Sequence, residues 1–207
     1  MSSPMKLGFR IIGVLTVAAA WGGSATAGDD SPDPVFGKWV VVEPVRGDVS
    51  IAPAHGREFV PLRSERRVRV GSLVDTRHGM VHLTSARGQA GSLQSGDFAR
   101  GVFRLSQPPA AAGLTVLVLK RGRFERCSSG APAKTAIRRL RAHADGRFRT
   151  SGRFAYATVV GTKWAMTDTC SGTLTVVSAG EVIVRDRARR RSVSVHEGER
   201  YLARRPG

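Results

Sequence analysis

Apolar residues recur at every second position along most of the chain, in short runs that glycine or polar residues interrupt. Successive side chains of a β-strand point to opposite faces, so a period of two is typical of strands with one buried face. Pairs at this spacing include Val49 and Ile51, Val68 and Val70, Val81 and Leu83, Val182 and Val184, and Val193 and Val195. Many short strands of this kind predict an all-β fold, either a sandwich, a barrel or a roll.

One segment departs from this pattern. Residues 134–143 contain no glycine or proline, follow Pro132, and place Ile137 and Leu140 three positions apart. We expect a short basic helix here, inserted between two β regions. The predicted organisation is a disordered lead at 28–34, an N-terminal β lobe at 35–107, a loop and helix insertion at 108–146, a C-terminal β core at 147–203 and a basic tail at 204–207.

The first 27 residues have the features of a secretory signal peptide. Lys6 and Arg10 precede an apolar stretch at residues 11–21, and small residues follow it. Ala25 and Ala27 stand at the positions that a signal peptidase recognises, so cleavage is expected before Gly28. Eleven apolar residues are too few to cross a bilayer core, which needs about 20. We therefore expect an exported protein, secreted or held in the cell envelope, with no transmembrane span in the mature chain.

The chain is strongly basic, with 33 Lys and Arg against 16 Asp and Glu. Its net charge of +17 becomes +15 once the two basic residues of the signal peptide are removed. Such a charge favours an anionic partner, either a cell-wall polymer or a membrane surface. Export argues against nucleic acid, and the aromatic residues show no spacing suited to base stacking. The chain gives no indication of a particular protein partner.

Cys127 and Cys170 are the only two cysteines in the chain. An even number of cysteines in an exported protein favours a disulfide, because the compartment is oxidising. We expect a bridge between them that ties the insertion to the C-terminal region, with unpaired thiols as the alternative.

Four motifs follow one another in the C-terminal half, at residues 159–164, 172–177, 180–184 and 193–199. Their glycines, threonines and alternating valines resemble the core of the FecR domain of bacterial envelope proteins. Segments at 45–49, 60–62, 71–76, 81–83 and 146–153 extend the likeness, and the whole is similar to secreted FecR-like proteins of actinobacteria. The resemblance implies a β-roll or sandwich scaffold and supplies no active site.

FecR-type regulators carry a cytoplasmic segment before a transmembrane helix, whereas only ten residues precede the apolar stretch here. The resemblance therefore implies the extracytoplasmic module alone, acting as a binding or scaffolding protein. A sensor component that works with a separate membrane partner is the first alternative.

A cysteine transpeptidase is the second alternative. Residues 167–170 resemble the Thr-Leu-x-Thr-Cys strand of sortases, and His143 and Arg185 are available to complete a catalytic set with Cys170. Asp168 replaces the leucine of that motif and would place a negative charge beside the thiolate, which disfavours this alternative.

No metal or other cofactor is expected. The histidines and cysteines show no zinc-ligand spacing, and His78 and His82 would lie about 13 Å apart along one strand. Arg189, Arg190 and Arg191 fall between two predicted strands, at a hairpin tip that could contact an anionic surface. The interpretation is a non-catalytic, exported FecR-like module of the cell envelope.

Overall fold

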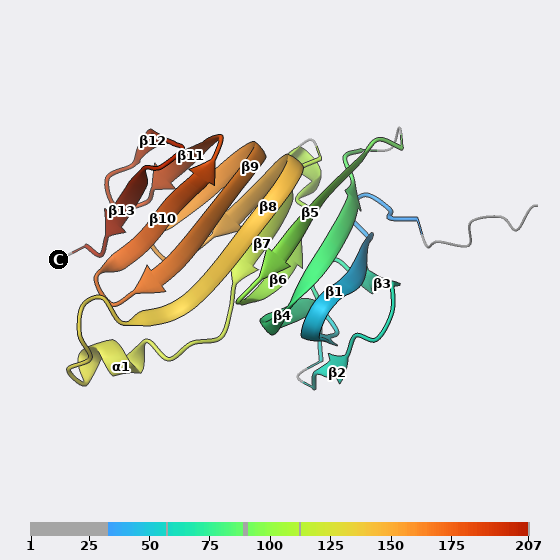
Figure 1. Ribbon diagram of the computed structural model, residues 1–207, viewed down its shortest axis with the longest axis horizontal. Coiled ribbons are helices and arrows are strands. Elements are labelled where there is room, and N and C mark those ends of the chain that lie inside the picture. Colours follow the sequence, from blue (N-terminus) through green and yellow to red (C-terminus); the bar gives the residue numbers. More distant parts are fainter. Residues whose placement is uncertain (1–32, 57, 89–90, 112, 207) are drawn as a thin grey trace, which may run out of the picture. The chain divides into compact units, whose positions relative to one another are not determined.

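The protein is all-β, as its period-two pattern predicts. The computed structural model describes residues 33–56, 58–88, 91–111 and 113–206 (Figure 1). The described residues contain one α-helix, α1 (Glu125–Ser128), and one 3-10 turn, η1 (Pro109–Ala111). They also form thirteen strands: β1 (Trp39–Ala52), β2 (Val60–Pro61), β3 (Arg66–Arg69), β4 (Leu73–Ala86), β5 (Leu93–Ala99), β6 (Val102–Ser106), β7 (Thr115–Leu119), β8 (Ala136–Ser151), β9 (Ala155–Thr169), β10 (Gly172–Ala179), β11 (Glu181–Asp186), β12 (Arg191–His196) and β13 (Arg200–Arg204).

Hydrogen-bonded pairing connects the strands into two layers that share their four longest members. The first layer has the order β3-β1-β4-β5-β8-β9-β10-β13. The second has the order β2-β1-β4-β6-β7-β8-β9-β11-β12. Figure 1 shows β6 and β7 behind β5 and β8. The β7–β8 pair is parallel, and all other pairs are antiparallel.

The long strands change layers at bends where the pairing register shifts. In the β1–β4 pair, Gly47 lies opposite Gly79 between two such shifts. A Cβ atom on Gly79 would lie 2.6 Å from the carbonyl oxygen of Asp48, so a side chain would not fit there. Gly47 has a φ of +63°, a conformation that glycine adopts without strain. The β8–β9 pair shifts in the same way between Ala144 and Arg147. Glycine and an irregular register thus let one strand serve both layers.

A single cluster of buried apolar side chains fills the space between the layers. The ring of Phe98 on β5 in the first layer lies 5.9 Å from that of Phe103 on β6 and 5.5 Å from that of Phe148 on β8, both in the second layer. All three side chains are fully buried. The cluster extends from Val40 to Ala203, so both predicted β regions contribute to one core.

The predicted helix at residues 134–143 is wrong, because strand β8 begins at Ala136 and includes most of this segment. Leu140, Ala142 and Ala144 are buried, and the residues between them are exposed, which is strand periodicity. Pairing with β5 and β9 on its two sides outweighs the helical propensity of a segment too short to be stable alone. The helix of the insertion is the single turn α1 instead. The boundary predicted after residue 146 falls inside β8.

The predicted signal peptide and its cleavage site at Ala25, Ala27 and Gly28 lie outside the described residues, as does most of the predicted lead. In the part of the chain that is described, no helix has the length and hydropathy needed to cross a membrane.

Candidate anion-binding groove

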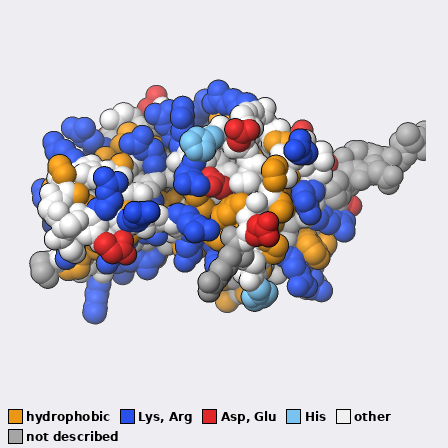
Figure 2. Space-filling model, turned by 90° about the horizontal axis from the view of Figure 1, so that it is seen from below, with side chains coloured by type: hydrophobic (Ala, Val, Ile, Leu, Met, Phe, Trp, Pro, Cys, Tyr) orange, Lys and Arg blue, Asp and Glu red, His pale blue; other side chains and the backbone are white. Residues whose placement is uncertain are grey.

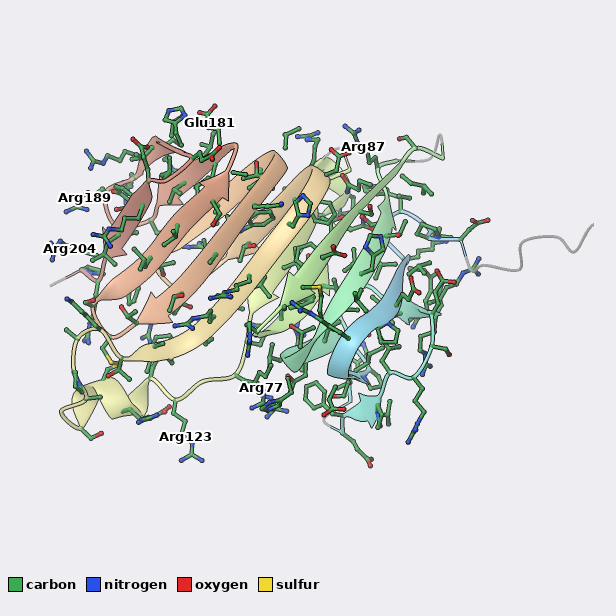
Figure 3. The ribbon with its side chains drawn as sticks, viewed as in Figure 1. Arg77, Arg87, Arg123, Glu181, Arg189 and Arg204 are labelled. Carbon is green, nitrogen blue, oxygen red and sulfur yellow. A yellow bond between two sulfur atoms is a disulfide. The ribbon has the colours of Figure 1, made fainter. Side chains whose placement is uncertain are left out.

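A groove lined by basic residues lies where four segments of the chain meet. Its walls come from the bend of β4, the β5–β6 turn, the connection between β7 and β8, and the first residues of β8. Two adjoining cavities of 370 and 360 Å³ form it, and they share Arg77, Gly122, Ala136 and Ile137. Figure 3 places Arg77 and Arg123 along the same lower edge of the molecule. Figure 2 views the molecule from below, and basic side chains are prominent on that face.

Eight basic side chains line the groove, and no described Asp or Glu does. Among the described residues, only two of the eight form ion pairs: Arg77 with Asp75 at 2.7 Å and Arg138 with Asp168 at 2.6 Å. Hydrogen bonds from Arg77 to Asp75 raise the pKa of Arg77 above its usual value. The basic residues of the groove are Arg77, Arg100, Lys120, Arg121, Arg123, Arg126, Arg138 and Arg139.

The backbone at two of these arginines is strained. Arg100 has a φ of +69° and Arg121 a φ of +61°, the left-handed region that residues with a Cβ rarely adopt. Such conformations cost of order 1 kcal/mol and are concentrated at functional sites. Among the described residues other than glycine, only Arg190 also has a positive φ. Two of the three strained positions therefore lie in the groove.

A glycine follows each of these two arginines and also lines the groove. A Cβ atom on Gly101 would lie 2.1 Å from the carbonyl oxygen of Arg139, and one on Gly122 would lie 2.6 Å from that of Ile137. Only glycine lets the two turns approach β8 so closely. The β5–β6 turn is also fixed to β4, since the amide of Thr76 donates to the carbonyl of Gly101 at 2.7 Å.

Residues 120–135, which connect β7 to β8, form a strap along the groove and carry four of its basic side chains. The strap contains α1, which has no buried residues. The disulfide between Cys127 and Cys170 links it to the β9–β10 turn, with the two Cα atoms 5.3 Å apart. The predicted bridge is thus confirmed. The amide of Ser171 also donates to the carbonyl of Ala133 at 3.0 Å, which fixes the strap near its second end.

Arg189 and Arg190 lie in the turn of the predicted hairpin between β11 and β12, and Arg191 is the first residue of β12. The carboxylate of Asp186, which is buried, accepts a hydrogen bond from the amide of Arg189 at 2.9 Å and one from the hydroxyl of Tyr201 at 2.8 Å. Figure 3 shows Arg189 at the left edge of the molecule, away from Arg77 and Arg123 at its lower edge. The hairpin arginines therefore belong to a separate surface, and their contact with an anionic polymer stays a prediction.

The residues of the transpeptidase alternative do not come together as a thiol site. Cys170 is part of the disulfide, so its sulfur is not a thiol. His143 is exposed on β8 opposite Lys163, and Arg185 lies on β11 opposite Tyr156, near the start of β9. Cys170 follows the other end of β9.

The histidines are not arranged around a metal. The Nδ1 atom of His82 lies 2.7 Å from a carboxylate oxygen of Asp97, and His78 lies opposite Asp48 in the β1–β4 pair. Within residues 33–206, apart from the four positions that are not described, no three His, Cys, Asp or Glu side chains lie close enough to hold a metal ion.

The groove was not predicted from the sequence, because its residues come from distant segments. A partial signal is present in the two Arg-Gly pairs, at residues 100–101 and 121–122, where a strained arginine precedes a glycine.

The chain matches no protein-family model, no curated protein and no solved structure.

Proposed function

We propose that this protein is a non-catalytic, exported module of the cell envelope that binds a linear anionic polymer of the cell wall in the groove. The observation that carries the proposal is the lining of the groove: eight basic side chains and no described acidic one. Only two of the eight are neutralised by an ion pair within the described residues. An uncompensated positive charge in a concave site attracts and concentrates anions.

A polymer fits the groove better than a single small anion. The two cavities adjoin, and basic side chains line both of them. Arginine presents several N–H donors in a planar group, which suits phosphate and carboxylate oxygens along a chain. Successive charges of one polymer would then bind different parts of the groove.

Export agrees with the other features of the chain. A disulfide such as that between Cys127 and Cys170 persists in an oxidising compartment. The resemblance to FecR-like proteins supports an extracytoplasmic β scaffold. Its glycines occupy positions with positive φ, as at Gly161 (+67°) and Gly180 (+78°), where turns need them.

Calorimetric titration of the purified protein with polyphosphate, poly-L-glutamate and uncharged dextran tests the proposal. Both polyanions should bind, and dextran should not. Affinity should fall steeply as salt rises, since the Debye length shrinks from about 8 Å at physiological ionic strength to about 3 Å at 1 M. Equal binding of dextran, or polyanion binding that salt leaves unchanged, would refute an electrostatic groove.

A further inference from the structure

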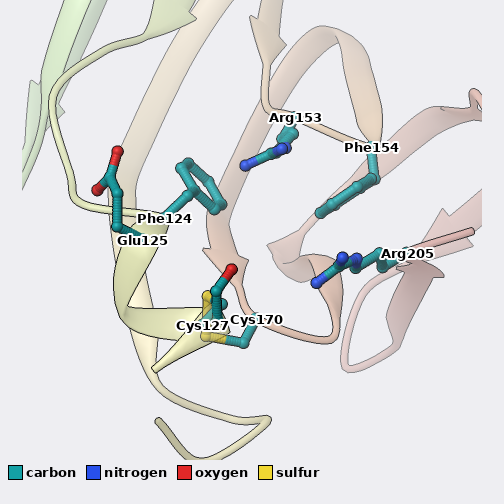
Figure 4. A pocket seen from close by; sticks show the side chains of 8 residues that line it. Phe124, Glu125, Cys127, Arg153, Phe154, Cys170 and Arg205 are labelled. Carbon is teal, nitrogen blue, oxygen red and sulfur yellow. A yellow bond between two sulfur atoms is a disulfide. The ribbon is translucent and has the colours of Figure 1, made fainter. Parts of the chain in front are cut away.

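A separate cavity of 280 Å³ lies on the other side of the strap from the groove. Phe124 of the strap, Phe154 of the β8–β9 turn and the Cys127–Cys170 disulfide form its walls, and Arg153 and Arg205 also line it (Figure 4). The side chain of Phe124 separates the two sites. Arg138, which belongs to the groove, lies 4.9 Å from the centre of its ring, and Arg153 lies 4.3 Å from the same centre.

Arg153 is held in a fixed position. Its amide donates to the buried carboxylate of Asp168 at 3.0 Å, and the amide of Phe154 donates to the hydroxyl of Thr173 at 3.0 Å. The guanidinium of Arg153 also lies 5.5 Å from the ring centre of Phe154, so it contacts the rings of both Phe124 and Phe154. Stacking of this kind orients the guanidinium and leaves its N–H groups available to a ligand.

Arg205 approaches the same cavity from the end of β13. Its amide donates to the carbonyl of Ser171 at 2.8 Å, next to the disulfide. Figure 4 shows the guanidinium groups of Arg153 and Arg205 both pointing toward Phe124 and the disulfide, whereas the carboxylate of Glu125 points away from them. In the described part of the chain, neither guanidinium forms an ion pair.

We propose that this cavity binds a small anion, a carboxylate or a phosphate, attached to an apolar or aromatic group. The two guanidiniums would hold the anion by charge-assisted hydrogen bonds. The rings of Phe124 and Phe154 would contact the apolar group. The volume lies near the lower end of the range for ligand sites, about 300 to 1,000 Å³, so the ligand is a small molecule or the end of a chain. This site is additional to the polymer groove and does not depend on it.

Phenyl phosphate and benzoate are suitable probes, with benzyl alcohol as the uncharged control. In calorimetric titrations of the full chain at low salt, at least one anion should bind with saturation, and the alcohol should not. Comparison of the two anions shows whether phosphate or carboxylate is the preferred group. Arg153→Gln and Arg205→Gln should each weaken binding about tenfold or more, the effect of losing one charge-assisted hydrogen bond.

Arg63→Gln is the matched control, because Arg63 is exposed and lines neither site. It removes the same charge and should leave affinity unchanged. Arg205→Gln leaves the contact of Arg153 with Phe124 intact, so the strap should stay in position. A loss of affinity in this variant therefore reports the lost contact with the anion. Reduction of the disulfide, which removes a wall of the cavity, should abolish binding.

Three results would overturn the proposal: no saturable binding of either anion, equal binding of benzyl alcohol, or an equal loss in Arg63→Gln. Polyphosphate titration of the same variants keeps the two proposals distinct. Arg205→Gln should retain polyphosphate binding. A protein that binds phenyl phosphate but not polyphosphate would refute the groove function alone.

Discussion

The groove and the β11–β12 hairpin are both rich in arginine, and they differ in how those arginines are arranged. Both contain strained arginines, Arg100 and Arg121 in the groove and Arg190 in the hairpin. Each also has a fully buried aspartate beneath it, Asp168 under the groove and Asp186 under the hairpin. In the hairpin, the arginines are consecutive and lie at the turn and the first residue of β12. In the groove, they come from four segments and converge.

This difference shows that arginine density alone does not make a binding site. Consecutive residues at a turn project mainly into solvent, where their charges are screened. Among the three hairpin arginines, only Arg189 has an ion pair within the described residues, with Asp186 at 3.4 Å. Side chains from distant segments surround a ligand, and their positions depend on the fold. Polyanion binding in the groove should therefore depend on the disulfide and on the conformation of single turns. Any binding at the β11–β12 hairpin should not.

The largest effect is expected from removing the disulfide. Cys127 and Cys170 are separated by 43 positions, and losing a closed loop of this length costs about 4 kcal/mol. The double variant Cys127→Ser, Cys170→Ser should lose about this amount of unfolding free energy in urea, and also affinity for polyphosphate, because the strap is no longer tied down. Reducing agent should have no further effect on the variant. An unchanged affinity would show that the strap keeps its place without the bridge.

Replacing three arginines by glutamine, either in the groove or in the hairpin, tests the difference between the two regions directly. The triple change of Arg121, Arg123 and Arg126 to Gln should weaken polyphosphate binding about 100-fold, equivalent to about 2.7 kcal/mol. The matched triple change of Arg189, Arg190 and Arg191 to Gln removes the same charge and should change affinity less than about threefold, since exposed pairs contribute little. Similar losses in both variants would mean that net charge, not convergence, controls binding.

Asp186→Asn should destabilise the hairpin region without affecting the groove. Burial raises the pKa of Asp186, but hydrogen bonds from the amide of Arg189 and the hydroxyl of Tyr201, with the charge of Arg189, lower it below its ordinary value of 3.8. A carboxylate with a lowered pKa stabilises the fold above pH 3.8, and this contribution is lost as pH falls further. At pH 7, the variant should be about 2 kcal/mol less stable, the contribution of hydrogen bonds to a charged group.

Urea unfolding of Asp186→Asn and of the parent protein, at pH 7 and at pH 3, measures this loss of stability and its pH dependence. The difference in stability should shrink at pH 3, and polyphosphate affinity at pH 7 should be the same for both proteins. A constant difference at the two pH values would show that Asp186 acts through packing and not through its charge.

The smallest effect is expected from relieving strain. Arg100→Gly should stabilise the fold by up to about 1 kcal/mol, because glycine adopts positive φ freely. It should also weaken polyphosphate binding about threefold through the lost charge. Arg190→Gly is the matched control, with a φ of +52° outside the groove, and should stabilise without weakening binding. Thermal unfolding and calorimetry measure the two quantities, and a loss of stability in Arg100→Gly would contradict the strain argument.

The strands and the disulfide could be predicted from the sequence, because both depend on local or simple rules. Alternation of valines fixes the buried face of a strand, and two cysteines allow one intramolecular bridge. The segment at residues 134–143 suggests a helix through the spacing of Ile137 and Leu140, although Leu140, Ala142 and Ala144 alternate as in a strand. Small alanines carry a weak hydrophobic signal, so pairing with β5 and β9 decided the outcome.

The groove could not be predicted, because it exists only after the strap has been positioned across the start of β8. Arg100 and Arg139 are neighbours through the approach of Gly101 to the backbone of β8, a contact between segments far apart in the chain. The ion pair of Arg138 with Asp168 also requires the β8–β9 register. The net charge of the chain predicts the sign of the partner's charge, but not the place where the partner binds.

The sharing of four strands between the layers has a consequence for how the protein opens. In a sandwich whose sheets are joined only by loops, one sheet can fray while the other stays intact. Here the hydrogen-bond ladders of β1, β4, β8 and β9 continue from one layer into the other. Separating the layers would break these ladders, so both layers form one cooperative unit. The strap has no such ladder, and its amides should exchange with solvent through local opening while those of the layers stay protected.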